Sequence, residues 1–193
     1  MALSNGFKKI KTAVFISGTG SNLRSLIKFS KLKKSPISID LIISDNANAK
    51  GLNYANIYKI KKKVFDFKQK SSSEKKILLE LKKYRIDLIC LAGFMKILSK
   101  QFIKNYDRKI LNIHPSLLPK YKGLNTHERS IKNNDRYSGC TVHYVNSKLD
   151  SGKIINQKKV KINKKDTVKT LAKKILIQEH KLYPEAILKV FNL

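Results

Sequence analysis

The sequence has no tryptophan, two cysteines, four prolines and only 13 acidic residues. Two cysteines cannot build the disulfide framework of a small secreted domain, so we expect a reducing, cytoplasmic location. The chain also lacks an apolar run of the roughly 18 residues that span a bilayer, and residues 1–11 lack the apolar centre of a signal peptide. We therefore expect no membrane partner.

Positive charge is abundant: 42 lysines and arginines give a net charge of +29. Nearly all of it is lysine, spread along the whole chain on faces that we expect to be solvated. Arginine, the side chain that reads phosphates and base edges in a bidentate way, occurs only at Arg24, Arg85, Arg108, Arg129 and Arg136. We interpret most of the charge as solvated surface and expect no specific nucleic acid partner. A polyanion partner is the alternative.

A chain of 193 residues is long enough for one domain with a full core and short for two. We expect residues 1–10 to form a flexible tail and residues 11–193 to form the domain. Apolar runs alternate with helical patterns at the spacing of βαβ units. The patterns predict strands at residues 11–17, 37–43, 64–67 and 86–92, and helices at residues 51–59 and 74–84.

The stretch before the second of these helices, residues 68–74, is predicted to be a loop that ends in a serine cap, with Glu74 in the first helical turn. Further along, alternating β-branched residues predict two more strands, and two cap signals predict helices. These strands cover residues 139–145 and 153–160, and the helices cover residues 126–133 and the stretch from Asp166 past Glu179. We therefore predict a single-domain α/β fold with a mostly parallel, twisted sheet of about seven strands and helices on both faces.

The first strand is followed at once by a glycine-rich turn, Gly18-Thr19-Gly20-Ser21-Asn22, and by a helical pattern. A strand, a glycine turn and a helix start form a ready site for an anion, because backbone N–H groups point at the ligand. The turn is neither a Walker loop nor a full dinucleotide fingerprint. Taken by itself, it is equally consistent with an ordinary tight connection.

The residues with the most chemical content are Asn112 and His114, which lie two positions apart in a short apolar run before Pro115. In a strand, this spacing puts both on one face, and proline should end the strand. Ligands of open α/β sheets bind at that end. An amide that donates to an oxyanion and an imidazole that carries a proton suit a tetrahedral intermediate. An isolated Asn-x-His is more often a loop cap and a core histidine.

The run Asn-Ile-His-Pro-Ser-Leu-Leu-Pro at residues 112–119, followed by Lys-Tyr and Gly123, resembles the signature of the folate-dependent formyltransferases. The resemblance extends from about Thr12 to Tyr183. It implies the formyltransferase fold, with a Rossmann-like, phosphate-binding half at residues 11–110 and a catalytic, folate-completing half at residues 111–193. It also implies small-molecule substrates and 10-formyltetrahydrofolate as co-substrate. Because the sequence shows no His/Cys/Asp cluster at metal-ligand spacing, we expect no metal, and we expect a monomer or weak homodimer.

A second stretch, Leu-Ala-Gly-Phe-Met-Lys-Ile-Leu-Ser at residues 91–99, resembles the family's folate segment. Without the resemblance, its apolar residues would be read as core packing. The resemblance implies that Asn112 and the stretch Met95, Lys96, Ile97 and Leu98 bind the folate. The resemblance assigns Lys70 to folate binding as well. Lys96 and Lys70 stand where arginine is usual in the family, which weakens a bidentate grip on the folate carboxylates.

The stretch from Val145 to Gly152 reproduces the family's Val-x-x-x-Leu-Asp-x-Gly spacing, which implies a catalytic role for Asp150. In isolation, this aspartate would be a turn residue. The glycine turn resembles the phosphate loop of the branch that acts on glycinamide ribonucleotide. The resemblance to this branch implies that Gly20, Ser21 and Asn22 hold the substrate phosphate, and that Glu179 contacts the ribose.

These assignments imply that the substrate amine attacks the formyl carbon. Asn112 and a protonated His114 then stabilise the oxyanion. Asp150 is expected near His114, where it favours the charged imidazole and helps to transfer a proton. His143 is expected to be a strand residue. Lys122 and Asn125 stand where the family usually has proline and histidine, which removes one imidazole, although His127 is kept.

Three other functions are weighed against this one. A methionyl-tRNA formyltransferase normally has a further C-terminal domain, whereas this chain ends about 80 residues after His114. A formyltetrahydrofolate hydrolase normally has an additional N-terminal domain, whereas the first strand here begins near residue 11. A basic RNA-binding module on the same fold would need aromatic platforms or an arginine stripe, and the sequence does not interleave its tyrosines and phenylalanines with arginine.

Overall fold

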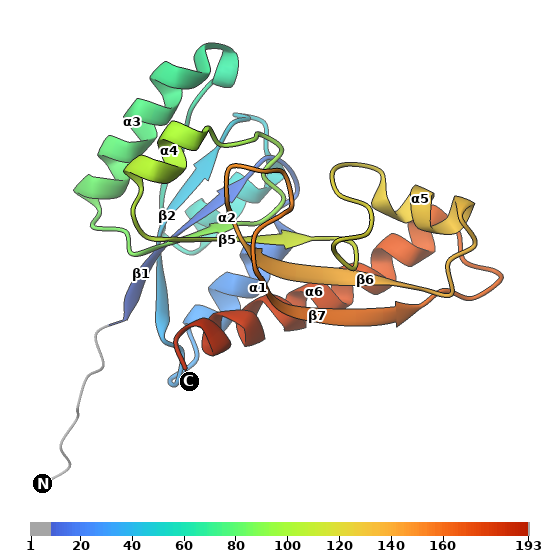
Figure 1. The fold of residues 1–193 in the computed structure, drawn as a ribbon. Helices are drawn as coiled ribbons and strands as arrows, with labels where there is room; N and C mark the ends of the chain where they lie inside the picture. The colour runs from blue at the N-terminus through green and yellow to red at the C-terminus, as the bar shows by residue number, and fades with distance from the viewer. Residues whose placement is uncertain (1–8, 193) are drawn as a thin grey trace, which may run out of the picture.

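Seven strands form one sheet in the order β3-β2-β1-β4-β5-β6-β7 (Figure 1). The structure is a computed structural model and describes residues 9–192. The first five strands pair in parallel, and β6 and β7 join the edge of the sheet in antiparallel fashion. The strands are β1 (Ile10–Ile16), β2 (Ile37–Ser44), β3 (Lys61–Val64), β4 (Leu88–Leu91), β5 (Lys109–His114), β6 (Tyr137–Tyr144) and β7 (Ile154–Lys161).

Helices cover both faces of this sheet, as predicted. On one face, apolar residues of α1 (Ser21–Ser30), α2 (Asn53–Ile57) and α6 (Val168–Val190) form a core with one set of strand residues. On the other face, α3 (Lys70–Lys83) and α4 (Lys100–Asn105) pack on the alternate set. Successive residues of β1 divide between the two cores, as the two-residue period of a strand requires. The predicted α/β class is confirmed.

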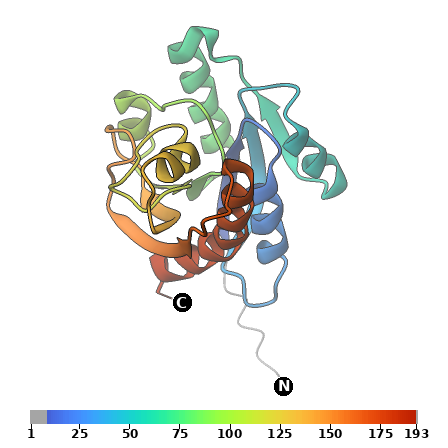
Figure 2. The same ribbon diagram turned by 90° about the vertical axis from the view of Figure 1, so that its right-hand side faces the viewer.

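Helix α6 extends along β6 and β7, and α5 (Thr126–Lys132) contacts it (Figure 2). The predicted cap of α6 is present: Thr167 and Thr170 form a reciprocal capping box. Further along α6, the buried Tyr183 hydroxyl lies 3.0 Å from the carbonyl oxygens of both Leu91 and Leu111. This hydroxyl therefore ties the carboxyl end of β4 to the middle of β5, immediately before Asn112, where the expected functional residues of that strand begin.

The lysine-rich stretch after β2 was the least well predicted. Strand β3 lies at Lys61–Val64, not at residues 64–67, because its four residues pair with the last four of β2. The predicted loop at residues 68–74 is wrong: a 3₁₀ turn, η2 (Phe67–Gln69), leads directly into α3. Asp66 caps this turn by accepting from the Lys68 amide at 2.9 Å, so helical structure begins earlier than the serines.

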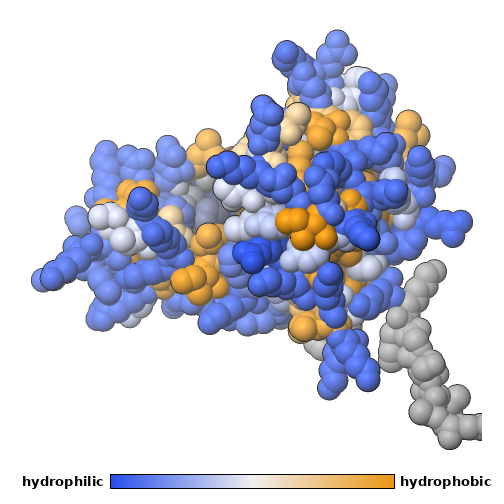
Figure 3. Space-filling model, turned by 180° about the vertical axis from the view of Figure 1, so that it is seen from behind, coloured by the Kyte–Doolittle hydropathy of each residue, from blue (hydrophilic) through white to orange (hydrophobic). Residues whose placement is uncertain are grey.

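Other boundaries differ by smaller amounts. The helix predicted over residues 51–59 is divided into η1 (Lys50–Leu52) and the short α2, and α4 was not predicted. The predicted tail of residues 1–10 lies mostly outside the described residues, and Ile10 already belongs to β1. Within the described part of the chain, no helix combines the length and the apolar character that a membrane span requires. The face opposite the view of Figure 1 is largely hydrophilic, with scattered apolar residues (Figure 3).

Candidate active site

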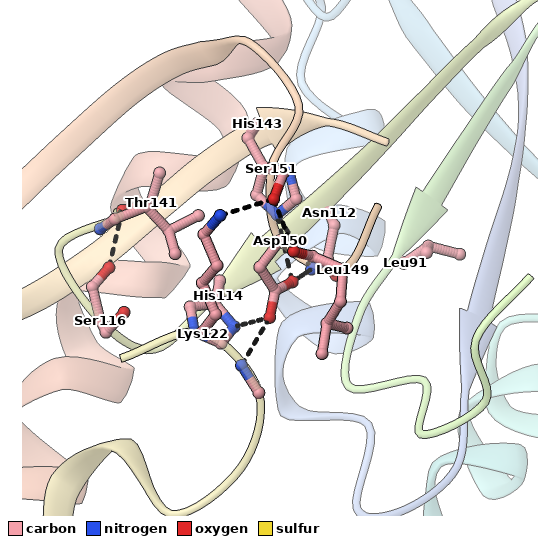
Figure 4. A network of polar contacts seen from close by, with 12 residues as sticks. Leu91, Asn112, His114, Ser116, Lys122, Thr141, His143, Leu149, Asp150 and Ser151 are labelled. Atoms are coloured by element: carbon pink, nitrogen blue, oxygen red, sulfur yellow. Dashed lines mark hydrogen bonds and ion pairs between the residues drawn. The ribbon is translucent and has the colours of Figure 1, made fainter. Parts of the chain in front are cut away.

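The candidate active site lies at the carboxyl end of β5, the strand that carries Asn112 and His114. The strand ends at His114, immediately before Pro115, as the sequence predicts. Asp150 comes from the turn between β6 and β7 and lies against the end of β5 (Figure 4). The antiparallel pairing of β5 with β6 thus brings Asp150, which is distant in the sequence, next to Asn112 and His114.

Asp150 is the centre of this group. Its Oδ2 atom lies 3.3 Å from Nδ1 of His114 and accepts a 2.9 Å hydrogen bond from the Gly123 amide. Its Oδ1 atom lies 3.5 Å from Nδ2 of Asn112. The side chains of His114 and Asp150 are only 6% and 8% exposed, so their interaction takes place largely out of water. The carboxamide, the imidazole and the carboxylate therefore converge as the sequence predicts.

His143 also belongs to this group, which the sequence did not indicate. It is a residue of β6, as expected, but its Nε2 atom lies 3.2 Å from Nδ2 of Asn112 and 3.6 Å from Oδ1 of Asp150. Its Nδ1 atom lies 2.8 Å from the Tyr144 carbonyl oxygen. The signal that could have found it is the strand pairing, because Asn112 and His143 are direct partners across β5 and β6.

Burial has the largest effect on the His114 ring and lowers its pKa. The Tyr121 carbonyl oxygen, 2.9 Å from Nε2, and the Asp150 carboxylate both raise that pKa, while the charges of His143 and Arg129 lower it further. Asp150 thus favours the charged imidazole as expected, but burial outweighs it. Both ring nitrogens nevertheless face hydrogen-bond acceptors, so the imidazolium is the form whose hydrogen bonds this geometry satisfies.

The pKa of Asp150 is lowered. Burial alone would raise it, but the contact with His143, the hydrogen bond from the Gly123 amide and the nearby imidazoles have the greater combined effect. Asp150 is therefore a carboxylate at neutral pH. A fixed negative charge beside a ring that can accept a proton is suited to holding a water or guiding a proton.

A cleft of about 870 Å³ opens above these residues and is large enough for a drug-sized ligand. Nine of the predicted site residues line it: Asn22, Met95, Lys96, Ile97, Leu98, Asn112, His114, Asp150 and Glu179. At its rim, Met95 and Ile97 are 63% and 59% exposed, which is unusual for large apolar side chains that serve only the core. The predicted folate segment therefore forms a wall of the cleft.

This wall is tied down at both ends. The Met95 amide donates to the Ser17 hydroxyl at 2.8 Å, and the Ser99 amide donates to the buried Glu74 carboxylate at 2.8 Å. Lys96 lies 3.8 Å from Asp45, which follows β2. The predicted folate residue Lys70 does not line the cleft. It lies at the start of α3, beside a smaller hollow that also includes Lys75.

At the other end of the cleft, Asn22 donates a 2.7 Å hydrogen bond to the buried carboxylate of Glu179. Burial raises the pKa of Glu179, and the hydrogen bond from Asn22 acts in the opposite direction. The Oδ1 atom of Asn22 is buried and has no hydrogen-bond partner among residues 9–192. A buried oxygen without a donor is an unsatisfied acceptor, and a hydroxyl of a bound ligand could supply the missing hydrogen bond.

Gly20 and Ser21 lie beside this end of the cleft but do not line it. Gly20 has φ 73° and immediately precedes α1, and a Cβ atom added to it would meet the Gly51 Cα atom at 2.6 Å. The Gly51 amide in turn donates to the Gly18 carbonyl oxygen at 2.9 Å. The glycine turn is therefore shaped by a close backbone approach that a side chain would prevent.

Comparisons with known proteins agree with this geometry. The formyl transferase family profile matches residues 10–187. The chain is 42% identical to the phosphoribosylglycinamide formyltransferase of Haemophilus influenzae, covering 92% of this chain and 85% of that protein. It is also 42% identical to the trifunctional purine biosynthetic protein adenosine-3 of Homo sapiens, but spans only 19% of that protein's length.

A solved structure shows the same fold. The phosphoribosylglycinamide formyltransferase from Brucella melitensis is 43% identical and superposes with a TM-score of 0.89, covering 95% of this chain and 96% of that chain. The family match spans the glycine turn, the carboxyl end of β5 and the Asp150 turn. With both sequence and fold in agreement over nearly its whole length, the chain belongs to the formyl transferase family.

Proposed function

We propose that this protein transfers a formyl group from 10-formyltetrahydrofolate to the amine of 5-phosphoribosyl-glycinamide, a step of purine biosynthesis. The observation that carries the proposal is the convergence of Asn112, His114 and Asp150 in a cleft whose far end holds Asn22 and Glu179. The bacterial relatives that carry this activity in their names match most of their own length, which supports the choice of substrate.

The two ends of the cleft suit the two substrates. The apolar rim at Met95 and Ile97 offers a surface for the flat pteridine of the folate, and Lys96 offers a charge for its carboxylates. The start of α1 directs backbone N–H groups toward a phosphate, and Glu179 can accept from ribose hydroxyls. With the two substrates bound in this way, we expect the glycinamide amine and the formyl group to meet above His114.

In the reaction, the amine nitrogen forms a bond to the formyl carbon, and the carbonyl electron pair moves onto the formyl oxygen. Asn112 donates to this oxyanion, and a protonated His114 stabilises it. The negative charge that develops there favours the imidazolium against the effect of burial. When the intermediate collapses, the bond to N10 of the folate breaks. A water held by Asp150 carries the proton from the amine to N10.

The alternative substrate is a methionyl-tRNA. The observation in its favour is the net charge of +29, which attracts nucleic acid at low salt. One assay separates the two: the protein is supplied with 10-formyltetrahydrofolate and with both acceptors in competition. We expect formylation of the ribonucleotide. Formylation of methionyl-tRNA alone would contradict the proposal.

The roles of the site residues are tested in the same assay. We expect His114→Ala and Asp150→Asn each to lower kcat by about 10²–10³, as the loss of a group that acts in the transition state does. Asp107→Asn is the matched control, since Asp107 is exposed and lies outside the cleft. Near wild-type turnover of either site variant would overturn the assignment.

A further inference from the structure

One short segment, residues 121–125, contacts both of the proposed catalytic side chains through its backbone. The Tyr121 carbonyl oxygen lies 2.9 Å from Nε2 of His114. Two residues later, the Gly123 amide donates to Oδ2 of Asp150 at 2.9 Å. The orientation of the imidazole relative to the carboxylate therefore depends on the conformation of this segment.

That conformation is unfavourable for the residues that adopt it. Tyr121, Gly123 and Asn125 all have positive φ angles, of 57°, 77° and 57°. Glycine adopts such angles freely and asparagine does so more readily than most residues, but for a bulky side chain such as tyrosine they are strained. Asn125 precedes α5 without a side-chain cap. Other contacts must therefore hold the segment in place.

Arg129, in the second turn of α5, makes such contacts. Its Nη1 atom donates to the Lys122 carbonyl oxygen at 2.7 Å and lies 3.4 Å from that of Leu124. Its guanidinium carbon lies 4.9 Å from the centre of the Tyr121 ring. A planar guanidinium can donate to carbonyls and stack on an aromatic ring at the same time, whereas a lysine ammonium cannot do both with this geometry.

We propose that Arg129 is a positioning residue, which holds the segment of residues 121–125 so that its backbone orients His114 and Asp150. Among residues 9–192, Arg129 forms no hydrogen bond or ion pair with either of these side chains. It acts through Lys122, Leu124 and the Tyr121 ring. The expected effect on kcat rests on the proposed formyl transfer, but the expected effect on the pKa of His114 does not.

The test compares Arg129→Met and Arg129→Lys with the matched control Arg136→Met. Arg136 is likewise exposed beside a tyrosine, with its guanidinium carbon 5.9 Å from the Tyr137 ring, but among the described residues its side chain forms no hydrogen bond to the segment of residues 121–125. Two kinds of measurement are made on the full chain. The first is an NMR titration that gives the pKa of the His114 ring, whose signal is identified by its absence from the spectrum of His114→Gln. The second is steady-state kinetics, which gives kcat and KM for each substrate.

Arg129 could affect His114 through its charge or by holding the segment, and for Arg129→Met these two explanations predict pKa changes of opposite sign at His114. The groups around His114 include Asp150, His143, His127 and Arg129. If Arg129 were only a nearby positive charge, Arg129→Met would raise the pKa of His114, and Arg129→Lys would leave it unchanged. If Arg129 holds the segment, both variants weaken the contact with the Tyr121 carbonyl. This contact affects the pKa of His114 more than the Arg129 charge does, so the pKa falls in both.

We expect the second result, together with a roughly tenfold fall in kcat, KM values within about twofold of wild type, and no change in Arg136→Met. An unchanged or raised pKa of His114 in both variants would overturn the proposal. If the wild-type protein transfers no formyl group, the proposed function fails, whereas the pKa shift still decides the role of Arg129.

Discussion

Asn112 and His143 face each other across β5 and β6, with Nδ2 of the amide 3.2 Å from Nε2 of the imidazole. His143 places its Nδ1 atom 2.8 Å from the Tyr144 carbonyl oxygen, so that nitrogen must be the donor and Nε2 the acceptor in the neutral ring. One N–H of the Asn112 amide is thereby directed toward His143. Its second, longer contact, 3.5 Å to Asp150, is the one more easily exchanged for a formyl oxygen.

This relationship predicts that His143 orients the amide that stabilises the oxyanion. Replacing it with phenylalanine keeps an aromatic ring in the buried position but removes the acceptor. We expect His143→Phe to lower kcat about 10- to 100-fold with a smaller change in KM. His143→Gln, which can still accept from Asn112, is the matched variant and should retain more activity. Equal kcat values for wild type and His143→Phe would show that the amide is held by other contacts.

The carboxylate of Asp150 is predicted to raise the proton affinity of His114 in the folded protein. Because burial already lowers the pKa of His114 and the negative charge of Asp150 opposes this effect, Asp150→Asn should lower that pKa further. NMR titration of the His114 ring measures the shift directly. The pH at which kcat/KM falls with loss of the imidazolium should move in the same direction. A raised pKa in the variant would contradict this account.

Glu179→Gln should make the free protein more stable at neutral pH while weakening substrate binding. Burial raises the folded-state pKa of Glu179 above its unfolded value. The ionised group therefore contributes a penalty that is absent at low pH and appears as pH rises through the unfolded and then the folded pKa. A neutral glutamine removes this penalty and loses the charged acceptor for ribose hydroxyls.

Urea unfolding at pH 4 and pH 7.5 checks this prediction. The gain in stability of Glu179→Gln over wild type should be present at the higher pH and small at the lower one. KM for the ribonucleotide should rise, while KM for the folate changes little. A variant less stable than wild type at pH 7.5 would mean that the bond from Asn22 outweighs the effect of burial.

Gly20→Ala should be destabilising, whereas Gly18→Ala should be nearly neutral. A Cβ atom at Gly20 would meet the Gly51 backbone at 2.6 Å, and its φ of 73° disfavours any side chain. A Cβ atom at Gly18 would meet no atom within 4 Å. We expect a loss of about 1–3 kcal/mol of stability for Gly20→Ala and a raised KM for the ribonucleotide. Equal melting temperatures for the two variants would contradict this reading of the turn.

Local patterns were sufficient to predict most of the fold. The two-residue period put Asn112 and His114 on one face of a strand, and proline chemistry ended that strand at His114. The alternation of apolar strands with helical patterns predicted the α/β class. These properties depend on neighbours in the chain, so the sequence carries them directly. The lysine-rich β3 has no such pattern, and its position was decided by pairing with β2.

The site depended more on contacts between distant segments. The place of His143 beside Asn112 follows from the antiparallel register of β5 and β6. The low pKa of His114 follows from burial by several elements, which no single stretch of sequence encodes. Lys70, placed near the folate by resemblance, lies at the start of α3 beside a separate hollow and does not line the cleft. The chemistry of the groups was readable from residue types, whereas their orientation and proton affinity were set by the packing that surrounds them.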